Sequence, residues 1–132
     1  MEAPTNRAQR PEPEELLELC WRFAADKKAL EPVALDLRGV AGFADYFLIV
    51  SGTSEPHLKA IAEAIAKGLK ELGILPRALE GIPSSHWIVL DYGDVVIHAF
   101  HPSTRRYYAL EQLWNDATPM PLASPQEQGR AG

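Results

Sequence analysis

Residues 46–73, YFLIVSGTSEPHLKAIAEAIAKGLKELG, decide the fold class because they join a strand to a helix. The run from Tyr46 to Val50 is continuously apolar and favours β-structure, which is typical of a strand covered on both faces. Ser54 predicts the N-cap of a helix, Pro56 suits its first turn, and Gly73 offers a left-handed end. The apolar stripe of this helix consists of Leu58, Ile61, Ala62, Ile65, Leu69 and Leu72. A buried strand that leads directly into an amphipathic helix predicts an α/β fold.

The remaining elements follow from periodicity on either side of this unit. A helix is expected upstream, over Glu14–Ala29, and is followed by a strand at Val33–Leu37. Downstream, the pattern predicts a short edge strand at Arg77–Glu80, a β-hairpin of Trp87–Asp91 and Val95–Phe100, and a final short helix that carries Tyr107 to Trp114. The order α-β-β-α-β-β-β-α predicts a mixed β-sheet with helices packed on it, and leaves the strand order open.

The length of 132 residues and the distribution of prolines indicate a single domain with two tails. Six of the eleven prolines lie in the two ends of the chain. Proline removes a backbone donor, so residues 1–13 and 117–132 are expected to be unstructured tails. The folded domain is then expected at residues 14–116.

Composition excludes several classes of protein. A net charge of −5 argues against broad binding to phosphate backbones. No apolar run approaches the roughly 18 residues that a membrane span needs, and the N-terminus lacks an apolar signal core, so a cytoplasmic location is expected. The single cysteine, Cys20, cannot form an intrachain disulfide, and its place in a helical stripe indicates a core residue.

Two segments raise the alternative of nucleotide chemistry. Backbone donors and hydroxyls of residues 51–54 could hold a phosphate, but the same residues suit a turn and a helix cap. Asp91 and Asp94 could hold magnesium, although paired catalytic acids usually occupy alternate positions of one strand. Their spacing across a turn favours a structural role. A nucleotidyltransferase-like enzyme using Gly52, Ser54, Asp91 and Asp94 therefore remains the alternative from a different functional class.

The histidines and aromatic residues each allow a structural and a functional interpretation. His57, His86, His98 and His101 lack the spacing of a tetrahedral metal site, and His98 is expected on a polar sheet face. Trp87, Tyr92 and Trp114 either close the edges of the core or anchor a protein interface, because Trp and Tyr bury a large area with few rotors. Arg105 and Arg106 suit a solvated helix start or the rim of such an interface.

Several segments, taken in order, resemble the Iojap/ribosomal silencing factor (RsfS) family. They are Asp36 within Ala-Leu-Asp-Leu, Asp45-Tyr46-Phe47, Ser51–Ser54, Glu80-Gly81, Trp87–Asp91, Gly93–His98 and Tyr107–Trp114. The resemblance extends from Leu16 to Trp114 and leaves out both proline-rich ends.

This resemblance implies a fold similar to nucleotidyltransferases but without the catalytic acid pair. It implies a protein that is not an enzyme, needs no cofactor or metal, and binds the large ribosomal subunit through ribosomal protein L-fourteen. Bound there, it would sterically block association with the small subunit and repress translation when nutrients are scarce. The partner-binding positions carried over are Trp87, Tyr92, Asp94 and His98, and a homodimer is expected for the free protein. An assembly factor of the large subunit with the same docking site is the alternative.

Overall fold

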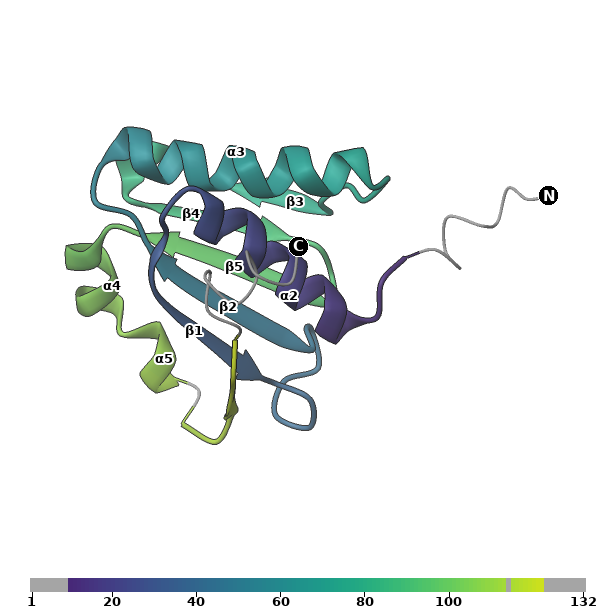
Figure 1. The fold of residues 1–132 in the computed structure, drawn as a ribbon. Coiled ribbons are helices and arrows are strands. Elements are labelled where there is room, and N and C mark those ends of the chain that lie inside the picture. Colours follow the sequence, from purple (N-terminus) through teal and green to yellow (C-terminus); the bar gives the residue numbers. More distant parts are fainter. Residues whose placement is uncertain (1–9, 114, 123–132) are drawn as a thin grey trace.

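The predicted strand at the centre of the sequence lies at the centre of a six-stranded mixed sheet, ordered β3-β4-β5-β2-β1-β6 (Figure 1). The structure, a computed structural model, describes residues 10–113 and 115–122. The helices are α2 (Pro13–Asp26), α3 (Glu55–Glu71), α4 (Pro102–Tyr108) and α5 (Leu110–Leu113), and a short 3₁₀ turn, η1, spans Pro83–Ser85. The strands are β1 (Leu30–Asp36), β2 (Tyr46–Ser51), β3 (Ala78–Glu80), β4 (Trp87–Asp91), β5 (Val95–Phe100) and β6 (Thr118–Met120). The predicted α/β class is confirmed.

Strands β2 and β5 form the middle of the sheet and pair in parallel, from Tyr46 opposite Val95 to Ser51 opposite Phe100. Every residue of both strands is buried, which confirms that the run from Tyr46 to Val50 is covered on both faces. The other neighbouring strands of the described chain pair antiparallel, including the predicted β4–β5 hairpin. Strand β3 lies at the edge of the sheet, as predicted for residues 77–80.

The two faces of the sheet are covered differently. Helices α2 and α3 bury one face, where they pack on Ala34, Tyr46, Leu48, Val50, Ile88, Leu90, Val95, Ile97 and Ala99. The opposite face carries Leu35, Phe47, Ile49, Val96 and Phe100, against which Leu110 of α5 and Ala117 pack. Only the short helices α4 and α5 therefore contribute helical cover to this second face within the described residues.

The junction of β2 and α3 follows the predicted local chemistry. The Ser54 hydroxyl accepts the His57 amide at 3.2 Å, which confirms the N-cap. Gly73 has φ +83° just after the end of α3, as a left-handed stop requires. Within α3, an added Cβ at Gly68 would lie 2.6 Å from ring atoms of Phe23 on α2. The close contact of these two helices therefore depends on glycine at this position.

Three element boundaries differ from the prediction. Helix α2 ends at Asp26 rather than Ala29, because Lys28 takes a left-handed φ of +61°. Strand β1 begins at Leu30 and ends at Asp36, with an irregular register between Leu30 and Val33. The predicted final helix is two short helices, because Ala109 has φ +48° and interrupts it.

The predicted domain boundary at Asp116 is wrong. Residues Thr118–Met120 form β6, which pairs with Ala34, Leu35 and Asp36 at the edge of the sheet. Pro119 is tolerated there because an edge strand can lack one ladder donor. The predicted tails otherwise lie largely outside the described residues. None of the described helices combines the length and the apolar character that crossing a membrane would require.

Candidate partner-binding surface

Aromatic side chains form one connected chain of ring contacts over the less covered face of the sheet. We call it the aromatic surface and define it as Phe43, Phe47, Trp87, His98, Phe100, Tyr107 and Tyr108. Its exposed members are Phe43 (58%), Tyr107 (82%) and Tyr108 (49%). Phe47, His98 and Phe100 are buried and link these exposed rings from below. Exposed aromatic rings held in this way are typical of a site that binds another protein.

Trp87 lies at the centre of the aromatic surface and is half-buried. Its ring stacks on Phe100, with centroids 4.8 Å apart, and contacts Tyr108 at 4.9 Å. Strand β5 and helix α4 thus hold the indole between them, with part of it left open to solvent. This placement is compatible with both roles considered for Trp87 from the sequence. The indole closes an edge of the core, and its open part is available to a partner.

His98 orients Trp87 from beneath. The Trp87 indole Nε1–H donates to His98 Nδ1 at 3.2 Å. Because Nδ1 accepts this bond, the proton of the neutral imidazole is assigned to Nε2, which is buried and has no hydrogen-bond partner among the described residues. The histidine ring also contacts Phe47, with centroids 4.5 Å apart.

The pKa of His98 is lowered to about 4 because burial penalises the charged imidazolium, and the nearby Asp91 carboxylate opposes this only partly. His98 is only 7% exposed, so it supports the aromatic surface rather than facing solvent from it. The neutral ring is what Trp87 requires, since a protonated Nδ1 could not accept the indole hydrogen bond. The expectation of a polar sheet face is therefore replaced by a buried, neutral histidine among aromatic rings.

Tyr92 lies on the other side of the sheet, and the expectation of an exposed anchor at the hairpin tip is wrong. Its side chain is 2% exposed and packs in the core beneath α2 and α3. Ile88 and Leu90 point to the same core, so Tyr92 continues the alternation of β4 by one step. Within the described part of the chain the hydroxyl has no hydrogen-bond partner, and burial raises the pKa of this phenol above its usual range.

Asp91 and Asp94 have different roles in the hairpin turn. Asp91 accepts the Gly93 amide at 2.8 Å, and Gly93 has φ +88°. The Asp94 side chain is 42% exposed, with one carboxylate oxygen 3.6 Å from Arg10 Nη2. The Asp94 carbonyl accepts the amides of Asp45 and Tyr46. Asp91 thus shapes the turn, and Asp94 remains at the surface for a charged contact.

The residues of the enzyme alternative do not form one site. Gly52 and Ser54 follow the end of β2, whereas Asp91 and Asp94 precede the start of β5, which lies at the opposite end of these parallel strands. Six strand residues separate the two ends, or about 17 Å. An added Cβ at Gly52 would lie 2.9 Å from Leu58, so this glycine serves the packing of α3.

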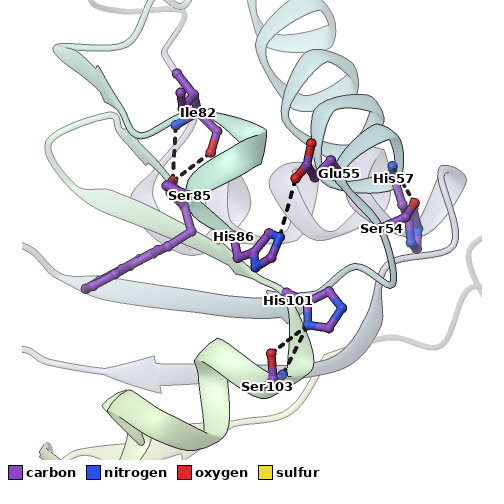
Figure 2. Close-up of polar contacts among 9 residues, drawn as sticks. Ser54, Glu55, His57, Ile82, Ser85, His86, His101 and Ser103 are labelled. Carbon is purple, nitrogen blue, oxygen red and sulfur yellow. Dashed lines mark hydrogen bonds and ion pairs between the residues drawn. The ribbon is translucent and has the colours of Figure 1, made fainter.

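Figure 2 shows how the remaining histidines are used near the ends of β2 and β5. His86 Nε2 lies 3.5 Å from the Glu55 carboxylate, and its ring centroid is 5.0 Å from that of His101. His101 caps α4 by accepting the Ser103 amide at 3.2 Å. Within residues 10–113 and 115–122, no three His, Cys, Asp or Glu side chains are grouped as metal ligands would be.

Two further candidates are placed as follows. Cys20 is fully buried and burial raises the pKa of its thiol, which matches the predicted core role. Arg105 is 8% exposed and donates to the Ser51 hydroxyl at 2.9 Å, so it is not the solvated residue that was expected. Arg106 is exposed, and Trp114 lies outside the described residues.

Residues 10–132 match the model of the RsfS family, which is described as ribosomal silencing factor during starvation. The chain belongs to the RsfS family. It is 45% identical over 109 residues to ribosomal silencing factor RsfS of Halalkalibacterium halodurans, across 83% of this chain and 93% of that one. It is also 40% identical over 75 residues to the mouse protein named mitochondrial assembly of ribosomal large subunit protein 1, across 54% of this chain and 33% of that protein.

The fold of this RsfS-family chain is shared with solved structures. A crystal structure of a Chromobacterium violaceum protein matches with a TM-score of 0.77 and 30% identity, over 88% of this chain and 99% of the other. One from Bacillus halodurans matches with a TM-score of 0.74 and 42% identity, over 83% and 99%. The resemblance stated from the sequence is therefore confirmed, whereas the likeness to nucleotidyltransferases stays a prediction.

Sequence reasoning did not single out Phe43, Tyr107 or Tyr108 as surface aromatics. Phe43 lies in the segment between β1 and β2, where no periodicity marks an outward side chain. The alternation of β4 and β5 contained a usable signal, since Trp87, Val89 and Asp91 share one face with His98 and Phe100. The same alternation separates Tyr92 from them.

Proposed function

We propose that this RsfS-family chain is a ribosomal silencing factor that binds the large ribosomal subunit through ribosomal protein L-fourteen. By occupying the face where the small subunit joins, it blocks association and represses translation under nutrient limitation. Its place of action would be the cytoplasm. The observation that carries the proposal is the aromatic surface, whose exposed rings, Phe43, Tyr107 and Tyr108, are supported by buried rings of the sheet.

Charge supports a basic protein as the partner. The chain carries a net charge of −5, and phosphate backbones would repel it. A basic ribosomal protein would instead be attracted, which speeds the encounter, while buried aromatic contacts set how long the complex lasts. Asp94 is a surface carboxylate beside the hairpin that would contribute to this attraction.

Four residues expected to bind the partner have distinct roles in this proposal. Trp87 would contact the partner, and His98 would position its indole through the 3.2 Å hydrogen bond. Asp94 would provide a charged contact. Tyr92 would act only by supporting the hairpin from the core, because it is 2% exposed.

The test is a comparison of Trp87→Ala and Tyr107→Ala in co-sedimentation with isolated large subunits. Loss of a central tryptophan is expected to cost about 2 kcal/mol, or about thirtyfold in Kd. Tyr107 is 82% exposed, so its removal should leave the fold intact while it weakens binding. Leu75→Ala, at a 65% exposed position outside the aromatic surface, is the control. Normal binding by both aromatic variants would refute this surface as the docking site.

A silencing function also requires that the bound protein inhibit the joining of the two ribosomal subunits. Light scattering of mixed subunits should show inhibition of joining in proportion to occupancy and without nucleotide, and preformed seventy-S particles should resist. Large-subunit binding with no loss of joining would favour the assembly role. That candidate is supported by the mouse relative, whose name states assembly of the ribosomal large subunit.

The proposal also holds that the chain is not an enzyme. Any nucleotide turnover in the presence of magnesium should stay at background, both in the unsubstituted protein and in the Asp91→Asn, Asp94→Asn variant. Magnesium-dependent turnover that this double substitution removes would contradict the proposal.

A further inference from the structure

A cavity of about 670 Å³ lies between α4–α5 and the start of β1. One wall is a stripe of α4 that continues to α5 at spacings of three and four, namely Pro102, Arg105, Arg106, Ala109 and Gln112. The other wall is formed by Glu31, Pro32 and Val33. Tyr107 and Tyr108 fall outside this stripe, so the cavity and the aromatic surface use different sides of the same short helix. Its volume falls within the range of small-molecule sites.

The cavity carries positive charge in a protein that is acidic overall. Among the described residues that line the cavity, Arg105 and Arg106 are cationic and Glu31 is anionic. Arg105 is 8% exposed and is held by its 2.9 Å hydrogen bond to Ser51 on β2. A basic side chain buried to this extent is uncommon, because removing its charge from water is costly. The bond to Ser51 fixes the guanidinium before any ligand arrives.

Backbone conformation points to the same place. Glu31 has φ +50° and Ala109 has φ +48°, a left-handed region that side chains other than glycine rarely adopt. These two residues lie on opposite walls of the cavity. Strained residues of this kind are often found at ligand sites, where the surrounding structure holds them in place.

The lining defines the chemistry of the ligand. Guanidinium groups recognise phosphate oxygens in a bidentate manner, and the Gln112 amide adds a further donor. Pro32, Val33 and Pro102 offer an apolar wall beside them. Glu31 would repel a second phosphate group, which disfavours a nucleic-acid backbone. We propose that this cavity binds a small phosphate monoester whose organic part packs on the apolar wall. The proposal does not depend on ribosome binding.

Phenyl phosphate and inorganic phosphate are suitable probes, titrated into the full chain at constant ionic strength. Calorimetry gives the affinity, and amide chemical shifts identify the residues affected. We expect saturable binding, shifts centred on Val33, Arg106 and Ala109, and an affinity for phenyl phosphate about tenfold higher than for inorganic phosphate. Arg106→Ala should weaken both ligands by about tenfold or more.

Lys59→Ala is the matched control, because it removes the same charge from the exposed side of α3. Its affinity for both probes should equal that of the unsubstituted chain. Equal losses in the Arg106 and Lys59 variants would mean that net charge alone attracts the anion, and would overturn the proposal. So would the absence of saturable binding, or tighter binding of a short single-stranded RNA that displaces phenyl phosphate.

Discussion

Acidification should destabilise this protein through His98. In the folded chain, burial lowers the pKa of His98 to about 4, whereas an exposed histidine titrates near 6.5. Between these two values the unfolded chain binds a proton that the folded chain does not. Stability contributed by the neutral ring is therefore present above pH 6.5 and is lost as pH falls toward 4.

The magnitude follows from the size of this pKa difference. Each pKa unit corresponds to about 1.4 kcal/mol, so the difference amounts to about 3 kcal/mol between pH 7 and pH 4. This is a large share of the 5–15 kcal/mol that stabilises a typical domain. The physical cost has two sources, which are the desolvation of the imidazolium and the loss of the Nδ1 acceptor for Trp87.

Urea unfolding at several pH values measures the effect. The unsubstituted chain should lose stability with a slope approaching 1.4 kcal/mol per pH unit below pH 6.5 beyond that of His98→Gln, which lacks this titration. Leu75→Gln is the control, because it introduces the same side chain at a 65% exposed position and removes no titrating group, and it should keep the slope of the unsubstituted chain. Parallel pH profiles of the unsubstituted chain and His98→Gln would refute the reasoning.

Three further predictions concern packing, the C-terminal edge and self-association. Gly68→Ala should destabilise the fold by about 1–2 kcal/mol, because its Cβ would meet the Phe23 ring at 2.6 Å. Gly42→Ala should change the unfolding midpoint little, because no atom of the described residues would lie within 4 Å of its Cβ. If both variants unfold at the same denaturant concentration, the α2–α3 contact is looser than the structure indicates. Deleting residues 117–132 should lower Tm by several degrees, because the deletion removes β6 and the buried Ala117. Calorimetry measures this change, and an unchanged Tm would show that β6 does not contribute to stability. Light scattering should report a dimer of the free chain at micromolar concentration, and a monomer at all concentrations would contradict the expected self-association.

Local patterns predicted the elements of this fold well because each pattern has a local physical cause. The Ser54 cap, the Gly73 stop and the hairpin at residues 87–100 all depend on neighbours within a few positions. The break at Ala109 and the strand at Thr118–Met120 could not be found in this way. Ala109 has no residue-type signal for a left-handed φ, and β6 acquires its strand conformation only from pairing with β1.

In the candidate site, too, local features could be predicted, whereas contacts between distant residues could not. Trp87 was found from composition and position, but its bond to His98 depends on a cross-strand register that no local pattern states. Tyr92 was misplaced because its position beside a turn was given more weight than the alternation of Ile88 and Leu90. The cavity at Arg105 and Arg106 could not be predicted from the sequence. Arg105 contacts Ser51 only in the folded chain, because the two residues are 54 positions apart.

The parallel pairing of β2 with β5 has a consequence for how the chain folds during synthesis. Tyr46 leaves the ribosome long before its partner Val95, with α3, β3 and β4 between them. Until Val95 is available, the edge of β2 that will pair with β5 has no partner strand and is free to pair with another chain. Contacts this distant in sequence slow folding, because the intervening loop must close first. The nascent N-terminal half is therefore the stage at which aggregation threatens this protein most. Helix α2 leaves the ribosome before β2 and packs on it, so α2 is the element that can cover one face of β2 earliest.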